Sequence, residues 1–148
     1  MLLMLGLVTQ AGAKDRQIYP DPGQAKADIA AALESAATSH KRVILDFGGN
    51  WCPDCQALYN YFHDAANQRI LADNFIVVYV NIGLRDANLD IAAHYQIPLE
   101  KGVPALAVLG SDGQLLFSQR TGEFEAMRHM QSGSVTGFLE QWKAAPRS

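Results

Sequence analysis

The chain has 148 residues, of which 49% are hydrophobic and 18% charged, and its formal net charge is −3. This length and composition fit one globular domain with its own core and exclude an intrinsically disordered chain. The small negative charge argues against a large basic surface for nucleic acid.

The first thirteen residues have the pattern of an export signal. Residues 1–13 contain no charged side chain, residues 2–8 are apolar, and Ala11-Gly12-Ala13 has the small-x-small form of a signal-peptidase site. We therefore expect cleavage before Lys14 and a single mature domain over residues 14–148. A buried N-terminal strand or helix is the alternative interpretation. Export would place the chain where disulfides can form.

Hydrophobic periodicity predicts helices and strands in alternation along the rest of the chain. Helices are expected at residues 25–38, 53–74, 86–95 and 135–142. The first follows a cap at Asp21 and Pro22, and the second is interrupted or kinked at 64–67. Strands are expected at 43–47, 75–82, 105–109 and 115–119, the last two joined by a hairpin turn at 111–114. This order predicts a mixed sheet flanked by helices, an α/β sandwich.

Several inward-facing side chains follow from the same periodicity. Ile29, Leu33, Ala36 and Ala37 should share one side of the first long helix, and Leu89 with Ala92 or Ala93 should face inward from the helix at 86–95. Phe124, Met127 and Met130 are expected to pack against the domain, with a partner surface as the alternative.

The only two cysteines lie in Trp51-Cys52-Pro53-Asp54-Cys55, directly after a predicted central strand and turn. Proline is favoured at the first helical position, which makes Cys52 the N-cap. The sulfur of Cys52 would then face backbone N–H groups at the positive end of the helix dipole. These conditions favour a thiolate, the species that attacks a disulfide. Cys55, one turn along the helix and more buried, is the natural second thiol.

Asp54 is expected to tune this site. Its carboxylate suits the helix N-terminus but competes with a Cys52 thiolate for the same positive potential and repels it. We therefore expect a less acidic Cys52 than a basic residue at position 54 would give, and a pair biased towards reducing its substrates.

Other interpretations of the cysteine pair remain. The two cysteines could form a structural disulfide, or serve a non-catalytic binding module that hands metal to a partner. His40, His63, His94 and His129 are scattered, so no zinc-type ligand spacing accompanies the pair, and Gln56 stands where a c-type haem site needs histidine. We expect no bound metal.

The chain resembles the thioredoxin superfamily, most closely its exported bacterial thioredoxin-like and disulfide isomerase-like members. The residues that carry the resemblance are the strand at 43–47, the Trp51–Cys55 motif, Gly102-Val103-Pro104 before a strand, and the closing hairpin and helix. The resemblance covers roughly residues 25–143. It implies a thioredoxin fold, with a central mixed β-sheet flanked by helices on both faces.

The resemblance also implies a role for each matching residue. Cys52 would attack a substrate disulfide and Cys55 would resolve the mixed disulfide. Trp51 would flank the site, and a cis Pro104 would bring the Val103 backbone beside the sulfurs to pair with an extended substrate. Asp46 would be the buried proton acceptor for Cys55; a structural, salt-bridged aspartate is the alternative.

One departure from the family affects Asp46. The lysine that faces this carboxylate in the family falls at Tyr79 here, so Asp46 would lack a cationic partner and stay protonated more readily.

The leader-like segment together with the resemblance implies a periplasmic or secreted protein, with a cytoplasmic location as the alternative. We expect a monomer without a cofactor. Such a protein would act as a reductase or isomerase of protein disulfides, and a membrane or soluble redox partner would recycle its dithiol. No nucleic-acid partner is expected.

Overall fold

The structure is a computed structural model that describes residues 16–144; the expected leader at residues 1–13 lies outside this range. Five α-helices are described: α1 (Ala25–Ser39), α2 (Pro53–Phe62), α3 (Ala65–Asn74), α4 (Leu89–His94) and α5 (Ser132–Trp142). The four strands are β1 (Arg42–Gly48), β2 (Phe75–Asn81), β3 (Ala105–Leu109) and β4 (Leu115–Ser118). Short 3₁₀ turns occur at η2 (Pro22–Gln24), η3 (Leu99–Lys101) and η4 (Met127–His129).

The four strands form one mixed sheet in the order β2-β1-β3-β4. β1 is parallel to β2 and antiparallel to β3, and β4 runs antiparallel to β3. β1 is therefore central, and its residues from Val43 to Gly48 are all buried. A continuous apolar run is what a strand covered on both faces requires.

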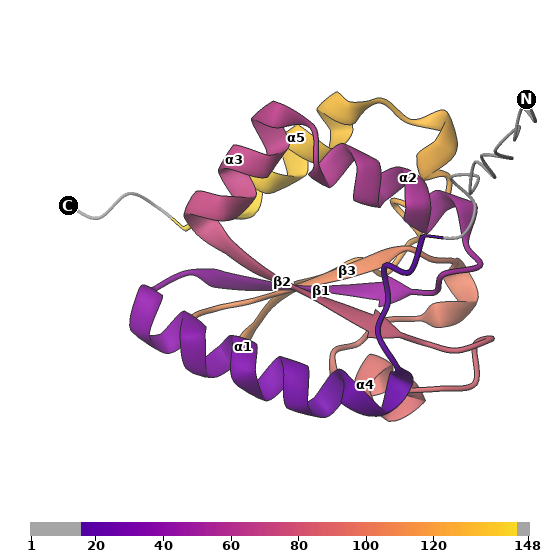
Figure 1. The fold of residues 1–148 in the computed structure, drawn as a ribbon, viewed down its shortest axis with the longest axis horizontal. Helices are drawn as coiled ribbons and strands as arrows, with labels where there is room; N and C mark the ends of the chain where they lie inside the picture. The colour runs from indigo at the N-terminus through magenta and orange to yellow at the C-terminus, as the bar shows by residue number, and fades with distance from the viewer. Residues whose placement is uncertain (1–15, 145–148) are drawn as a thin grey trace, which may run out of the picture.

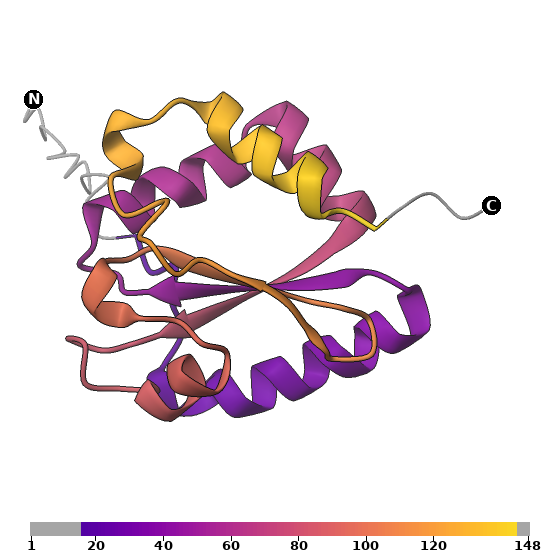
Figure 2. The same ribbon diagram turned by 180° about the vertical axis from the view of Figure 1, so that it is seen from behind.

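Helices cover both faces of the sheet. α1 and α4 lie on one face, and α2, α3 and α5 lie on the other (Figures 1 and 2). The core is divided accordingly: Leu45 and Phe47 of β1 belong to the cluster on the α1 side, whereas Ile44 packs with Leu58 and Phe62 of α2. The predicted α/β thioredoxin-type architecture, with a mixed sheet between two helical layers, is confirmed.

Local signals explain where several elements begin and end. The Asp21 side chain accepts a hydrogen bond from the Gly23 N–H at 2.8 Å, which caps η2 before α1. α1 ends at His40, which adopts a left-handed conformation with φ 57°. The predicted interruption after Phe62 is a complete break, because α2 ends there and α3 starts at Ala65. The packed interpretation of Phe124, Met127 and Met130 is confirmed, since the first two are buried and Met130 is half-buried against the same core.

Two predicted faces are corrected. Leu89 is 49% exposed and Ile91 faces the core in its place, whereas the predicted inward position of Ala92 is confirmed. The physical reason is that residues 83–88 form a loop ending at Asn88 in a left-handed conformation, so the helix starts later and with a different phase than periodicity predicts. In α1, Ile29 and Ala36 are buried as predicted and Leu33 is half-buried against the same core, but Ala37 is exposed and Ala32 is buried in its place.

No helix within residues 16–144 combines the length and apolar character needed to cross a bilayer.

Candidate active site

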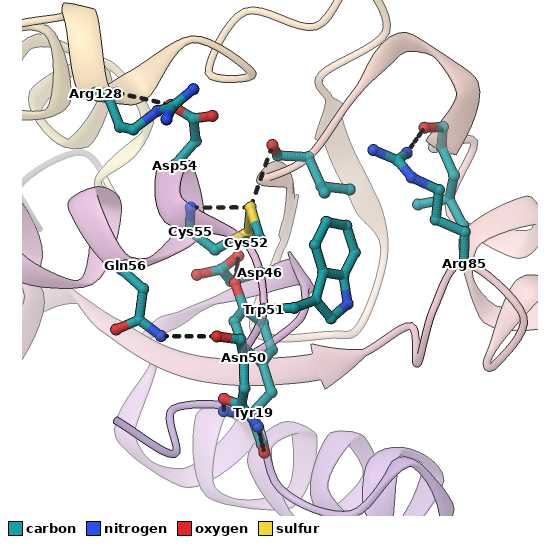
Figure 3. Close-up of a disulfide and its surroundings, with 12 residues drawn as sticks. Tyr19, Asp46, Asn50, Trp51, Cys52, Asp54, Cys55, Gln56, Arg85 and Arg128 are labelled. Carbon is teal, nitrogen blue, oxygen red and sulfur yellow. Dashed lines mark hydrogen bonds and ion pairs between the residues drawn. A yellow bond between two sulfur atoms is a disulfide. The ribbon is translucent and has the colours of Figure 1, made fainter. Parts of the chain in front are cut away.

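The cysteine pair lies where the carboxyl end of β1 meets the N-terminus of α2. Pro53 is the first residue of α2, and Cys52 is its N-cap in an extended conformation. The Cys52 Sγ accepts a hydrogen bond from the Cys55 N–H at 3.1 Å (Figure 3). The predicted capping geometry is therefore confirmed, and it places a sulfur on an otherwise unpaired helix N–H.

Cys52 and Cys55 are joined by a disulfide, with their Cα atoms 5.2 Å apart. Cys52 is 3% exposed and Cys55 is fully buried. The structure thus brings together the two predicted sulfurs, with Cys52 the one nearer to solvent.

The backbone before β3 reaches the same sulfur. The Val103–Pro104 peptide bond is cis, and the Val103 carbonyl oxygen lies 3.7 Å from the Cys52 Sγ. Both residues are buried. Val103, 51 residues beyond Cys52 in sequence, therefore lies beside the disulfide, where the resemblance placed it.

Trp51 forms one rim of the site, together with a loop that the sequence did not point to. The indole Nε1–H donates to the Gly83 carbonyl at 2.6 Å, and the Arg85 guanidinium lies over the ring, 5.5 Å from its centre. Arg85 also donates to the Leu99 carbonyl at 2.9 Å. Trp51 is 45% exposed and the neighbouring Leu84 is 77% exposed, so this rim presents apolar surface beside the sulfurs.

The opposite rim is an ion pair. Asp54 Oδ1 accepts from both the backbone N–H and the Nε of Arg128, at 2.9 and 3.1 Å (Figure 3). The Asp54 side chain is 14% exposed, whereas that of Arg128 is 54% exposed. Arg128 offsets part of the negative charge of Asp54, so the repulsion predicted between Asp54 and a Cys52 thiolate is weaker than the motif alone indicates. Nothing in the local sequence pairs these two residues, which are 74 positions apart.

Asp46 lies fully buried on β1, opposite Tyr79 of β2. Its Oδ1 accepts a hydrogen bond from the Tyr19 hydroxyl at 2.8 Å, whereas Oδ2 has no partner among residues 16–144. Burial raises the pKa of Asp46 from an ordinary value of 3.8 to about 7, although the hydrogen bond from Tyr19 acts in the opposite direction. Within residues 16–144 no salt bridge involves Asp46, which argues against the structural ion-pair interpretation.

Tyr19 and Tyr79 respond to the same carboxylate. Burial raises the pKa of Tyr19 well above its usual range, and the nearby Asp46 raises it further. Burial, followed by Asp46, also raises the pKa of Tyr79. Both tyrosines therefore stay neutral, and Asp46 is the group that titrates near neutral pH. Tyr19 was not predicted from the sequence; an isolated Ile-Tyr pair before a helix cap carries no recognisable signal.

Residues 16–144 do not provide a set of side chains that could bind a metal ion. No group of three or more His, Cys, Asp or Glu side chains there is arranged to hold a metal ion.

A redox-capable cysteine pair at a helix N-terminus, beside a proline loop and above a buried carboxyl, defines the class of thioredoxin-fold dithiol–disulfide proteins. A sequence profile described as thioredoxin-like matches residues 24–111. The chain belongs to this thioredoxin-like family of thiol–disulfide oxidoreductases.

Individual relatives agree with this assignment. A disulphide isomerase from Xylella fastidiosa is 31% identical, with a TM-score of 0.81, over 85% of this chain and 96% of that one. The C-terminal domain of DsbD from Neisseria meningitidis shares the fold, with a TM-score of 0.57 and 20% identity over 84% of this chain and 98% of that one.

A third relative is much longer. The thiol:disulfide interchange protein DsbD of Pseudomonas fluorescens is 25% identical over 118 residues, which is 78% of this chain but 18% of that protein. The chain thus spans less than a fifth of the length of this curated relative.

Proposed function

We propose that the protein reduces or rearranges disulfides of other proteins outside the cytoplasm, with Cys52 as the attacking thiol and Cys55 as the resolving thiol. The observation that carries the proposal is the position of the Cys52 sulfur. It caps α2, belongs to the less buried of the two cysteines and lies beside the Val103 carbonyl, where an extended substrate backbone can align.

The reaction transfers two electrons from the dithiol to the substrate. The Cys52 thiolate attacks one substrate sulfur, and the other leaves as a thiolate. Cys55 then loses its proton and attacks the Cys52 sulfur, which closes the Cys52–Cys55 disulfide and releases the second substrate thiolate. Asp46, with a pKa of about 7, has the proton affinity suited to accept the Cys55 proton at neutral pH.

The buried carboxylate supports the reducing direction. An ionised Asp46 without a cationic partner penalises a second negative charge on the neighbouring thiols, whereas the neutral disulfide carries no such penalty. The oxidised protein is thereby favoured over the reduced form that carries a thiolate. We expect a reduction potential closer to the about −270 mV of thioredoxin than to the about −120 mV of a strong disulfide oxidant.

Substrate contact is assigned to the apolar rim. Trp51, next to Cys52, exposes apolar surface, and Leu84 adds to it from the loop whose Gly83 carbonyl binds the indole. The anchored Arg85 holds the indole in place. Such a surface suits unfolded or partly folded polypeptides whose cysteines lie among apolar residues.

The proposed location and partner follow from the relatives and the N-terminal sequence. The relatives include a disulphide isomerase and thiol:disulfide interchange proteins. Together with the expected leader at residues 1–13, they support an exported protein that a separate redox partner keeps reduced.

Insulin reduction tests the proposal. Purified wild-type protein, supplied with dithiothreitol, should accelerate precipitation of the insulin B chain, and Cys52→Ser should be inactive. Cys55→Ser should accumulate mixed disulfides with insulin. A variant with both Cys52→Ser and Cys55→Ser should form none. Equal rates for wild type and Cys52→Ser would contradict the proposed function.

A further inference from the structure

A tyrosine from outside the Trp51–Cys55 motif reaches into the centre of the site. Tyr19 lies in the segment that precedes η2, and its side chain is 2% exposed. Its hydroxyl donates to Asp46 Oδ1 at 2.8 Å across a separation of 27 residues. Its ring also meets Tyr79 edge to face, with ring centres 5.6 Å apart. The N-terminal segment therefore supplies the hydrogen-bond donor for the buried carboxyl.

Asn50 fixes this segment to the cysteine turn. Its Oδ1 accepts from the backbone N–H groups of Ile18 and Tyr19, both at 2.8 Å, and its Nδ2 donates to the Tyr19 carbonyl at 3.0 Å. Gln56 of α2 donates to the Asn50 carbonyl at 3.1 Å (Figure 3). Asn50, two positions before Cys52, thus makes two hydrogen bonds to the Tyr19 backbone and one to that of Ile18, which specify the position of this segment more strongly than apolar packing alone.

The Tyr19 hydroxyl is also close to the resolving sulfur. A Cβ atom on Gly48 would come within 3.0 Å of both the Tyr19 hydroxyl and the Cys55 Sγ. Gly48 and Asp46 are two positions apart on β1, so they face the same side of the sheet. Asp46, Tyr19 and Cys55 therefore converge on one buried space, which only a glycine at position 48 leaves open.

We propose that Tyr19 is a positioning residue for the resolving step: its hydroxyl occupies Oδ1 of Asp46 and leaves Oδ2 free to take the proton of Cys55. This inference rests on the proposed function. The Cys55 S–H bond breaks as its proton passes to Oδ2, and the Cys55 thiolate forms a bond to the Cys52 sulfur. The Cys52–substrate bond breaks, and the substrate leaves as a thiolate, which takes up a proton from Asp46 or solvent.

The groups that face Asp46 make Tyr19 the specific partner. Tyr79 approaches from β2, with Tyr59 of α2 beside it, and Cys55 approaches from α2. On the other side, β3 places Leu106 opposite Asp46. Among these groups, Tyr19 makes the hydrogen bond to the carboxyl. Removing the Tyr19 hydroxyl therefore deprives ionised Asp46 of its donor and raises the pKa of this carboxyl.

A two-phase reaction isolates the step. Reduced protein is mixed with dithiobis(nitrobenzoate), an aromatic disulfide that releases a coloured thiolate. The first equivalent reports attack by Cys52, and the second reports attack by Cys55 on the mixed disulfide. Both phases are followed from pH 5 to pH 9 in wild type, Tyr19→Phe, Asp46→Asn and the double variant. Tyr61→Phe is the matched control, because its hydroxyl donates to the Met130 carbonyl at 2.9 Å, outside the site.

In Tyr19→Phe, the pH at which the second-phase rate is half-maximal, its midpoint, should rise by about one unit. A hydrogen bond to an ionised group is worth about one to two pKa units. The second phase at pH 7 should slow by about fivefold, and the first phase should not slow, because a less ionised Asp46 adds no repulsion to the Cys52 thiolate. Asn50→Ala, which releases the segment but keeps the hydroxyl, should shift the midpoint in the same direction. In the Asp46→Asn background, Tyr19→Phe should produce no further shift.

An unshifted midpoint in both Tyr19→Phe and Asn50→Ala would overturn the inference, and so would an equal shift in the absence of the Asp46 carboxyl. These results leave the proposed function intact. A wild-type protein that never releases the second equivalent would contradict the proposed function and, with it, this inference.

Discussion

Asp46 should make the folded protein less stable as the pH rises. Its pKa is about 7 in the folded protein, against an ordinary value of 3.8, so the folded state binds the proton more tightly than the unfolded chain does. Between about pH 4 and pH 7 the unfolded chain has lost this proton and the folded protein has kept it. Stability therefore falls with rising pH across this window, because the slope follows the excess of protons bound in the unfolded state, which is negative here.

Asp46→Asn removes this titration, and Asn can still accept the Tyr19 hydrogen bond through its own Oδ1. One pKa unit corresponds to about 1.4 kcal/mol, and the two states differ by nearly one bound proton from pH 5 until the folded carboxyl ionises near pH 7. The free energy of unfolding of Asp46→Asn minus that of wild type should thus grow by about 2–3 kcal/mol from pH 5 to pH 8. Any fixed cost of burying the amide cancels, because it is the same at both pH values.

Urea unfolding of both proteins, with the disulfide intact, measures this quantity at the two pH values. Asp73→Asn, at an exposed aspartate, is the control for a general effect of charge. A difference between Asp46→Asn and wild type that is the same at pH 5 and pH 8 would refute the argument, because it would mean that Asp46 titrates as an ordinary carboxyl.

Three further predictions concern the surroundings of the disulfide. Gly48→Ala should destabilise the fold by about 1–3 kcal/mol through overpacking. Gly137→Ala in α5, where an added Cβ meets nothing within 4 Å, should stabilise the fold by about 0.5–1 kcal/mol. Chemical unfolding of the two variants and wild type measures both effects. Arg128→Ala should slow the attack of Cys52 on dithiobis(nitrobenzoate) at pH 7 by roughly two- to fivefold, the size of effect expected from a partly exposed ion pair, and Arg128→Lys should recover part of the rate. Leu84→Ser should raise the KM for insulin several-fold with an unchanged midpoint of unfolding, since Leu84 is 77% exposed and contributes little to the core; an unchanged KM would remove this loop from the substrate surface.

The sequence predicts the parts of the site that depend on local order. A buried strand, a glycine turn, an N-cap cysteine and a proline at the first helical position are neighbours in the chain, so their geometry follows from helix and strand rules. The contact of Val103 with Cys52 spans 51 residues and was accessible only through the resemblance to a family.

The parts that the sequence missed are long side chains meeting across the fold. Tyr19 reaches Asp46 and Arg128 reaches Asp54 from segments with irregular backbone, where no periodicity indicates which way a side chain points. The error at Leu89 has a related cause, because the left-handed Asn88 resets the helix phase and a hydrophobic pattern does not record backbone conformation.

The redox state of the Cys52–Cys55 pair in living cells tests the central claim most directly. Cells are quenched with acid, free thiols are alkylated with a reagent that adds mass, and the protein is separated on a gel. If the protein reduces or isomerises protein disulfides, a substantial fraction of the Cys52–Cys55 pair should be in the dithiol form at steady state. Cys52→Ser should remove the disulfide form. A pair that is entirely oxidised in growing cells would contradict the account.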